Sequence, residues 1–157
     1  DFQSDEPLII AYGDDVLVGT NQDLLPSKVA AWVNRNTTFC ITPADKGDAF
    51  NDETDIHQCQ FLKRHFTPDP DFPHLIHPTI EPATYEQSVM WQRTGDFQET
   101  INSLAQLVWH RGPYTYRKWC NAIAAKCDEG GHQIPYFPPF SLLRHNWLMK
   151  FEVMVPV

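Results

Sequence analysis

Apolar positions at the start of the chain form two short runs that meet at a polar turn. Residues 8–11 and 16–19 are apolar, and Tyr12-Gly13-Asp14-Asp15 separates them. A glycine at the first central position of a two-residue loop favours a type II′ turn. The pattern therefore predicts a β-hairpin with Asp14 at its tip and Asp15 at the start of the return strand.

The segments that follow alternate between helix and strand signals. Residues 26–35 carry apolar side chains at helical spacing, behind a proline suited to the first turn of a helix. Residues 37–42 are predicted as a strand, and the polar residues 47–55 as a loop. A second, tighter hairpin is expected from strands at residues 58–62 and 65–67, with its turn at Lys63-Arg64.

A run rich in proline and aspartate at residues 68–73 predicts a subdomain boundary, and the pattern beyond it is helical. Asp96 is a suitable N-cap, and Gly112 follows the expected end of that helix. The helices are predicted at residues 82–93, 96–111, 113–126 and 139–151. The sequence therefore predicts an α+β chain, with a β-rich part at residues 1–68 and an α-helical part at residues 69–157.

Composition indicates a globular chain that is not basic. Of its 157 residues, 42% are hydrophobic and 13% aromatic, and the net charge is −8. A self-contained nucleic-acid-binding domain should be basic, because neutralised phosphates supply most of its affinity. We therefore expect this chain alone to bind RNA poorly. No apolar run approaches the roughly 18 residues that a membrane span requires.

The adjacent carboxylates of Asp14 and Asp15 suggest a metal site. Mg²⁺ takes oxygen ligands and is usually held by one or two carboxylates together with substrate phosphates. Neighbouring side chains on a strand point to opposite faces, so at least one further carboxylate would have to come from elsewhere. The alternative is an acidic surface turn, because turns favour glycine and aspartate anyway.

Several motifs in a fixed order decide between these interpretations. They are Ala11-Tyr-Gly-Asp-Asp-Val16, Thr42-Pro43-Ala44-Asp45-Lys46, Phe61-Leu62-Lys63-Arg64, Leu75-Ile76-His77-Pro78, Leu107-Val108-Trp109-His110, and Ser141-Leu142-Leu143 with Trp147 and Phe151. In this order the chain resembles the picornavirus-type viral RNA-dependent RNA polymerases. The resemblance implies a right-hand polymerase fold, with the end of the palm at residues 1–68 and the thumb at residues 69–157.

The resemblance also implies roles for particular side chains. Asp14 is expected to bind metal directly and Asp15 to bind or support it, with Mg²⁺ as the cofactor and Mn²⁺ as a possible substitute. Lys46 is expected to be the general acid that protonates the departing pyrophosphate; otherwise it is a solvated loop lysine. Lys63 and Arg64 are expected to hold the primer backbone or the triphosphate; otherwise they form a charged turn.

The implied function is that of a viral RNA-directed RNA polymerase. Its expected partners are an RNA template and primer, nucleoside triphosphates, the N-terminal fingers and palm of the same polymerase, and other viral replication proteins. The expected location is the host cytoplasm, at membrane-associated replication complexes. Because the chain opens at Asp1 shortly before its first strand, we expect the C-terminal portion of a longer protein, inactive when isolated.

Two other functions remain open on the sequence. One is a reverse transcriptase, whose palm also carries paired aspartates; the motifs around Lys46 and Lys63 argue against it. The other is a non-enzymatic acidic helical interaction module, in which the aspartate hairpin is only a turn.

Further residues with possible chemistry have simpler explanations. Cys120, Cys127 and His132 lack the tight Cys-x₂-Cys spacing of zinc sites, and we expect the two cysteines to share a buried helix face. The acidic residues 48–55 do not match a calcium loop, and a solvated loop is expected. The tryptophans of the helical part are expected in the core, with a base-stacking role as the alternative: Trp91, Trp109, Trp119 and Trp147.

Overall fold

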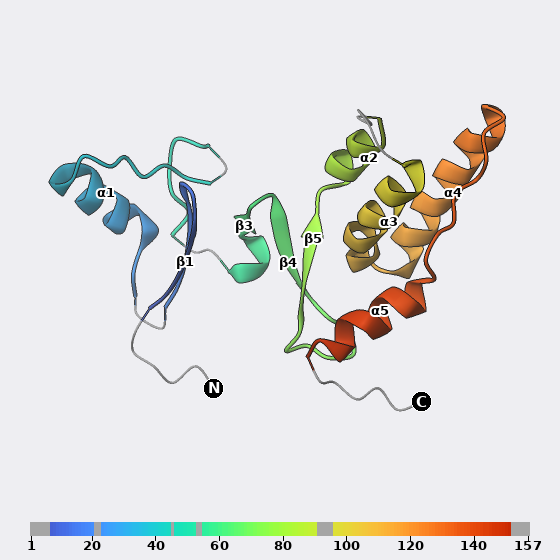
Figure 1. Ribbon diagram of the computed structural model, residues 1–157. Coiled ribbons are helices and arrows are strands. Elements are labelled where there is room, and N and C mark those ends of the chain that lie inside the picture. The colour runs from blue at the N-terminus through green and yellow to red at the C-terminus, as the bar shows by residue number, and fades with distance from the viewer. Residues whose placement is uncertain (1–6, 21–22, 45, 53–54, 91–95, 152–157) are drawn as a thin grey trace. The chain divides into compact units, whose positions relative to one another are not determined.

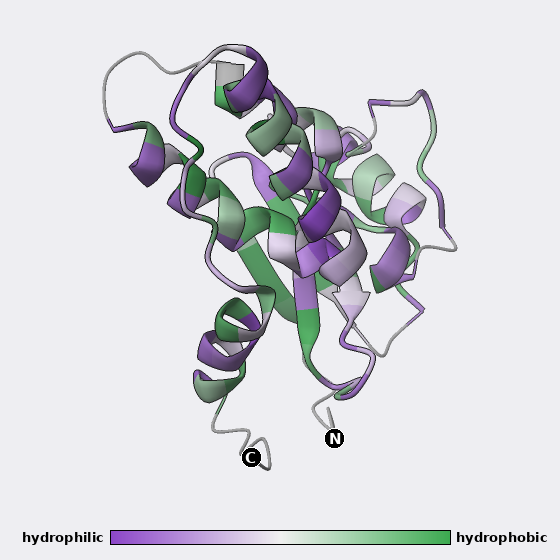
Figure 2. Cartoon of the chain, turned by 90° about the vertical axis from the view of Figure 1, so that its right-hand side faces the viewer, coloured by the Kyte–Doolittle hydropathy of each residue, from purple (hydrophilic) through white to green (hydrophobic). Residues whose placement is uncertain are grey.

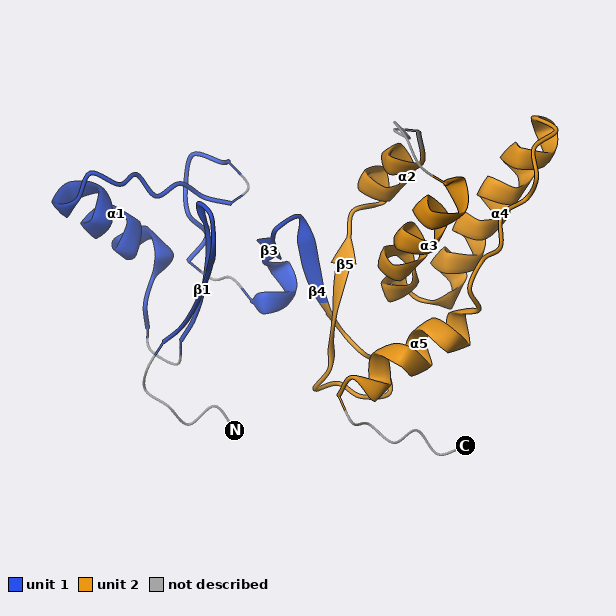
Figure 3. Cartoon of the chain, viewed as in Figure 1, with its two compact units in different colours: residues 1–66 blue, residues 67–157 orange. Residues whose placement is uncertain are grey.

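The computed structural model describes residues 7–20, 23–44, 46–52, 55–90 and 96–151. The chain divides into two compact units, residues 1–66 and residues 67–157 (Figure 3). Strands and helices both occur, which confirms the predicted α+β class. Most helices carry hydrophobic and hydrophilic residues side by side, as expected of helices with one buried face (Figure 2).

The first hairpin of the first unit has the predicted form (Figure 1). Strands β1 (Leu8–Tyr12) and β2 (Asp15–Gly19) are antiparallel, and Tyr12 lies opposite Asp15 at the closed end. Gly13 has a φ of 63°, whereas Asp14 is not among the residues with positive φ. A single positive φ at the first central position is the signature of a type II′ turn, so this prediction is confirmed.

Helix α1 (Pro26–Asn36) begins at the predicted proline and ends one residue beyond the predicted end. The strand predicted at residues 37–42 is wrong, because the Asn34 side chain and a backbone carbonyl at the end of the helix bind N–H groups that a strand would use. The Ile41 N–H donates to Oδ1 of Asn34 at 2.7 Å, and the Thr37 N–H donates to the Val33 carbonyl at 2.9 Å. The segment therefore runs back along α1 without a strand partner.

The acidic residues after this segment are more than a solvated loop. The Asp52 carboxylate accepts hydrogen bonds from the backbone N–H and the hydroxyl of Ser27, at 2.8 and 2.5 Å. Asp55 caps the short 3₁₀ helix η1 (Ile56–Gln58) by accepting from the His57 N–H at 2.8 Å. The predicted loop is confirmed in outline, but two of its carboxylates accept hydrogen bonds at the N-terminal ends of helices α1 and η1.

The second hairpin is confirmed, but its turn lies one residue earlier than predicted. Strands β3 (Gln60–Phe61) and β4 (Arg64–Pro68) are antiparallel, with Phe61 opposite Arg64. The central turn residues Leu62 and Lys63 have φ values of 51° and 59°. Two positive φ angles define a type I′ turn, whose twist suits a two-residue hairpin loop. Arg64 is therefore the first residue of β4 and not part of the turn.

Strand β5 (Ile76–Ile80) was not predicted. The sequence lacks the usual alternation of buried apolar and exposed polar residues, because the polar side chains of His77 and Thr79 are buried. Pro78 also interrupts the run. The sheet has the strand order β3-β4-β5, so β5 is an edge strand, where a missing N–H is tolerated.

The helices of the second unit confirm the predicted helical part. They are α2 (Pro82–Met90), α3 (Phe97–Val108), η2 (Trp109–Arg111), α4 (Pro113–Glu129) and α5 (Phe140–Met149). Asp96 caps α3 by accepting from the Gln98 N–H at 2.8 Å, and Gly112 has a φ of 92°. The end of the helix predicted at residues 82–93 lies outside the described residues. Among the described helices, none is long and apolar enough to cross a membrane.

The core of the second unit is built around α3. Its buried residues recur at positions i, i+3, i+4 and i+7: Ile101, Leu104, Ala105 and Val108. Trp109 and Trp119 are buried in the same cluster and Trp147 packs against it, which confirms the core role predicted for them. Trp91 lies outside the described residues. Cys120 and Cys127 both face this cluster from α4, as predicted.

The segment at residues 131–139 has no regular structure but is held at several points. The Gln98 side-chain amide forms two hydrogen bonds with the Tyr136 backbone, donating to its carbonyl and accepting from its N–H, each at 2.8 Å. Phe137 packs edge-on against Trp119 with ring centroids 5.9 Å apart. The Tyr116 hydroxyl donates to the Pro138 carbonyl at 2.6 Å.

Candidate functional site

The paired aspartates stand exposed at the end of the β1–β2 hairpin. Asp14 occupies the turn, and Asp15 lies opposite Tyr12 in the last pair of the ladder. Directly opposed residues of an antiparallel pair share a face, so Asp15 projects from the same face as Tyr12. Both carboxylates are accessible, and their oxygens suit the ligand preference of Mg²⁺.

The described part of the chain does not complete a metal site by itself. Among its residues, no group of three or more histidine, cysteine, aspartate or glutamate side chains is placed to hold a metal ion. Asp14 and Asp15 fit a shared site in which substrate phosphates and other protein groups supply the remaining ligands.

Lys46 lies exposed in the loop that follows α1. Its backbone adopts the left-handed region with a φ of 59°, and its N–H donates to the Pro43 carbonyl at 3.0 Å. This tight turn sets Lys46 apart from the regular elements and leaves its side chain in solvent.

The two hairpin cations occupy different environments. Lys63 is exposed at the second central position of the type I′ turn, whereas Arg64 is half-buried on β4. Lys63 is therefore free to approach a ligand from the tip. The sequence predicted a turn at Lys63-Arg64. The turn lies one residue earlier, so only Lys63 belongs to it.

All five residues predicted to form the site lie in the first unit. Strands β2 and β3 lie in contact, so the hairpin with the aspartates neighbours the hairpin with Lys63 and Arg64. Lys46 is carried by the loop between α1 and the second hairpin.

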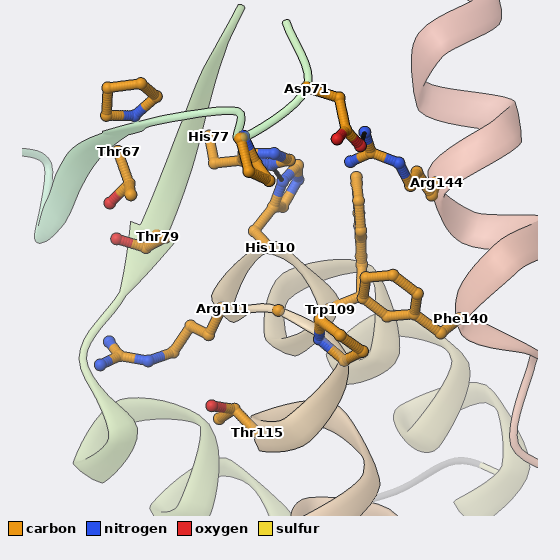
Figure 4. Close-up of a pocket in the computed structure, with 14 residues that line it drawn as sticks. Thr67, Asp71, His77, Thr79, Trp109, His110, Arg111, Thr115, Phe140 and Arg144 are labelled. Atoms are coloured by element: carbon orange, nitrogen blue, oxygen red, sulfur yellow. Dashed lines mark hydrogen bonds and ion pairs between the residues drawn. The ribbon is translucent and has the colours of Figure 1, made fainter. Parts of the chain in front are cut away.

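A separate pocket of about 490 Å³ lies in the second unit, and none of the five predicted residues lines it. Figure 4 shows its labelled side chains, which come from β4, the segment between β4 and β5, β5, η2, α4 and α5. Its polar lining includes three threonines and the Arg111 side chain, which donates to the Ile80 carbonyl at 2.8 Å.

A buried polar network forms one wall of this pocket. Asp69 is 1% exposed and accepts from the Arg144 guanidinium at 2.5 and 3.1 Å and from His77 Nε2–H at 2.8 Å. The N–H groups of Asp71 and Phe72 donate to it at 2.9 Å. Burial alone raises the pKa of Asp69, but the hydrogen bonds from Arg144, His77 and the backbone outweigh it and hold the pKa far below its usual value.

A histidine pair extends the network. Nδ1 of His77 and Nδ1 of His110 are 2.8 Å apart, so one ring donates and the other accepts. The His77 ring also stacks on Trp147, with centroids 4.4 Å apart and planes 19° from parallel. The sequence motifs contain all three residues, but nothing in their spacing indicates that they meet.

An exposed basic face of α4 was also missed. Tyr114, Arg117, Lys118 and Asn121 line a shallow hollow of about 270 Å³, and Tyr114 is 80% exposed. Their spacing of i, i+3, i+4 and i+7 places them on one helix face. The spacing of these residues could have indicated a basic helix face from the sequence alone, but the net charge of −8 argued against a basic surface.

Comparisons with known proteins agree on one family. The family model described as "Viral RNA-dependent RNA polymerase" matches residues 1–128. The genome polyprotein of Human klassevirus 1 is 44% identical over 144 residues, and that of Salivirus A (isolate Human/Nigeria/NG-J1/2007) is 43% identical over 144. Each match covers 92% of this chain and 6% of the polyprotein.

A solved structure, the Sicinivirus 3Dpol RNA dependent RNA polymerase, is similar with a TM-score of 0.82 and 46% sequence identity. The match covers 92% of this chain and 31% of that polymerase, so the chain spans about a third of the solved protein's length. The sequence, the fold and the Gly-Asp-Asp hairpin therefore agree that this chain belongs to the viral RNA-dependent RNA polymerase family.

Proposed function

We propose that the complete protein is an RNA-directed RNA polymerase that copies an RNA template during viral genome replication. In this proposal residues 1–68 are the end of the palm and residues 69–157 are the thumb. The observation that carries it is the type II′ hairpin with exposed Asp14 and Asp15, in a chain of this family.

Asp14 and Asp15 would hold Mg²⁺, and Mn²⁺ would be able to replace it. When bound, the metal would stabilise the charge that develops on the attacking and leaving oxygens. Asp14 is the first choice for a direct ligand, because the turn places it at the tip. Asp15 is fixed by the last ladder pair and would bind or support from one face of the hairpin.

Lys46 would serve as the general acid. Its ammonium group would donate a proton to the pyrophosphate oxygen as the bond to the α-phosphorus breaks. Its exposure at a tight turn supports access to a bound triphosphate.

Lys63 would contact the primer backbone as a point charge, and Arg64 would support it from β4. The basic face of α4, with Tyr114, Arg117 and Lys118, would face the product duplex. Most of the remaining cationic surface must belong to the rest of the polymerase, because this chain has a net charge of −8.

The partners that follow from this function are an RNA template and primer, nucleoside triphosphates, the fingers and remaining palm, and other viral replication proteins. The site of action would be the host cytoplasm, at membrane-associated replication complexes.

The decisive experiment is RNA-templated primer extension by the full-length polymerase, comparing wild type with Asp14→Asn. Removing one charge from the metal ligand should lower the rate by at least about 100-fold at an unchanged melting temperature. Asp48→Asn is the matched control, because it removes an exposed carboxylate outside the site. It should retain the wild-type rate.

Equal activity of Asp14→Asn and wild type would refute the site. Preference for deoxynucleotides would favour the reverse transcriptase, and a lack of extension with either metal would favour the interaction module. The isolated chain of 157 residues should be inactive in the same assay, because it lacks the remaining metal ligands and the fingers.

A further inference from the structure

Two side-chain clamps tie the ends of the loop that carries Lys46 to the same helix. We define the Lys46 loop as residues 42–51, between Ile41 and Asp52. Ile41 is bound by Asn34 near the end of α1, and Asp52 is bound to Ser27 at its beginning.

The clamp at Ile41 resembles the pairing between two strands. Asn34 Oδ1 accepts from the Ile41 N–H at 2.7 Å, and Asn34 Nδ2 donates to the Ile41 carbonyl at 3.4 Å. One side-chain amide thus engages both backbone groups of the residue before the loop, and its direction is fixed as the chain leaves the helix.

The clamp at Asp52 uses the polarity of α1. Ser27 is the second residue of the helix, where backbone N–H groups lack intrahelical partners and the helix dipole favours a negative charge. Asp52 accepts from this N–H and from the Ser27 hydroxyl. The bond from the Ser27 side chain is also the main cause of the lowered pKa of Asp52, so the carboxylate is charged at neutral pH.

The two clamps fix the distance that the loop must bridge. Ser27 and Asn34 are separated by seven residues of helix, which corresponds to about 10 Å. A loop of about ten residues could extend to roughly 33 Å. The Lys46 loop must therefore fold back on itself between two fixed ends, and Lys46 lies near its middle, at the turn with φ of 59°.

We propose that Asn34 and Asp52 are positioning residues for Lys46: they hold the loop on α1 so that the ammonium group reaches the leaving pyrophosphate. This inference rests on the proposed acid role of Lys46. Catalytic geometry is sensitive to small displacements, since a shift of about 1 Å can cost about 100-fold in rate. The clamps act on the rate of the chemical step and not on nucleotide binding.

The test measures single-nucleotide addition by the full-length polymerase at saturating and at limiting nucleotide. Asp52→Ala should lower the maximal rate about 10-fold while the KM for nucleotide changes less than about twofold. Ser27→Ala, which keeps the backbone N–H, should have a smaller effect. Ser27→Thr retains a hydroxyl, so its maximal rate should be higher than that of Ser27→Ala and equal to the wild-type rate. Asp48→Ala, an exposed carboxylate of the same loop, is the matched control at the wild-type rate.

A double-mutant cycle separates positioning from a general structural effect. If Asp52 acts through Lys46, adding Asp52→Ala to Lys46→Leu should lower the rate by less than about twofold beyond the single Lys46 variant. Multiplied effects, or an Asp52→Ala polymerase at the wild-type rate, would overturn the inference while leaving the acid role intact. A Lys46→Leu polymerase at the wild-type rate would instead overturn the acid role, and the inference with it.

Discussion

Asp69 is a carboxylate that the fold buries and then surrounds with donors. Its two oxygens accept from the Arg144 guanidinium, from the His77 ring and from two backbone N–H groups. A buried charge is tolerated only when it is paired and its lone pairs are occupied. The pair joins the segment before β5 to α5, elements that are distant in sequence.

Asp69→Asn should destabilise the protein by about 3 kcal/mol. The substitution removes the negative charge that pairs with Arg144, and the amide N–H group would face a donor of Arg144 or His77. The measurement is urea unfolding of the full-length polymerase, followed by the fluorescence of Trp109 and Trp147 near the network. Asp71→Asn is the matched control. It removes the exposed partner of Arg144 and should cost less than about 1 kcal/mol.

The same substitution should change the response to acid. Because the pKa of Asp69 is lower in the folded state than the ordinary value of about 3.9, its contribution is complete above that value. The contribution fades as the pH falls through about 4 towards the folded pKa. The wild-type protein should therefore lose more stability between about pH 5 and pH 3 than Asp69→Asn does. An identical acid response in both proteins would contradict the network.

Residues were predictable where a local rule governs them. Gly13 and Asp14 were placed correctly, because the turn depends only on its own four residues. The partnership of Asp69 with Arg144 spans 75 positions, and the sequence near either residue gives no sign of it. Asp52 was missed for the same reason, since its partner Ser27 lies 25 positions away.

At the scale of elements, the β3–β4 turn combines strain with charge. Leu62 and Lys63 both adopt positive φ angles, which cost roughly 1 kcal/mol for a residue with a Cβ atom. Lys63→Gly should therefore raise the free energy of unfolding by about 0.5–1 kcal/mol. It should also weaken primer binding, because the exposed ammonium group is lost. Thermal unfolding and the KM for primer measure the two effects.

Leu62→Asn provides the control for this turn. Asparagine tolerates the left-handed region, so it should relieve strain at φ of 51° without removing a charge. Stability should rise and the KM for primer should stay at the wild-type value. A fall in primer affinity with Leu62→Asn would show that backbone geometry, and not the Lys63 charge, determines binding.

Elements were predicted well when their ends carry their own signals. Helix α3 has Asp96 at its start, a buried stripe along its length and Gly112 beyond η2, and all were legible. The strand expected at residues 37–42 failed, because β propensity matters only where a neighbouring strand is available. Strand β5 was hidden because its buried face is polar: His77 and Thr79 are both buried, and His77 is hydrogen-bonded to Asp69 and His110.

At the scale of the whole molecule, the first hairpin is apolar on both faces and exposed. Ile9 and Val18 lie opposite each other on one face and are 61% and 51% exposed. Leu8 and Ile10 are exposed on the other face. A strand pair of this kind needs cover. Because the chain spans 31% of the related polymerase, we expect the rest of the protein to provide that cover.

Ile9→Lys with Val18→Lys tests this expectation in two proteins. In the isolated chain, the substitutions should reduce self-association measured by light scattering, because two charges replace an exposed apolar pair. In the full-length polymerase, they should lower the melting temperature by several degrees, because the same charges would be buried. An unchanged melting temperature of the full-length protein would show that this face stays exposed there.

The family, the α+β class and the need for a further metal-binding carboxylate could be recognised from this sequence, but the origin of that carboxylate could not. The ordered motifs around Asp14, Lys46 and Lys63 are local, so a partial chain retains them. Under the proposed function, the remaining metal ligands and most of the cationic surface would belong to other segments of the polymerase, and the net charge of −8 by itself argues against RNA binding by this chain. Folding rules within a fragment give no information about partners it lacks.

The contact between Gln98 and Tyr136 constrains the length of a segment more than its composition. At residue 136, Gln98 bonds only to the backbone N–H and carbonyl, so any residue except proline, which has no N–H, is compatible there. Deleting a single residue between Gly131 and Tyr136 would bring a different peptide group to Gln98 and draw Phe137 away from Trp119. Natural variation should therefore substitute freely at position 136 while leaving the spacing from α4 to Phe137 unchanged.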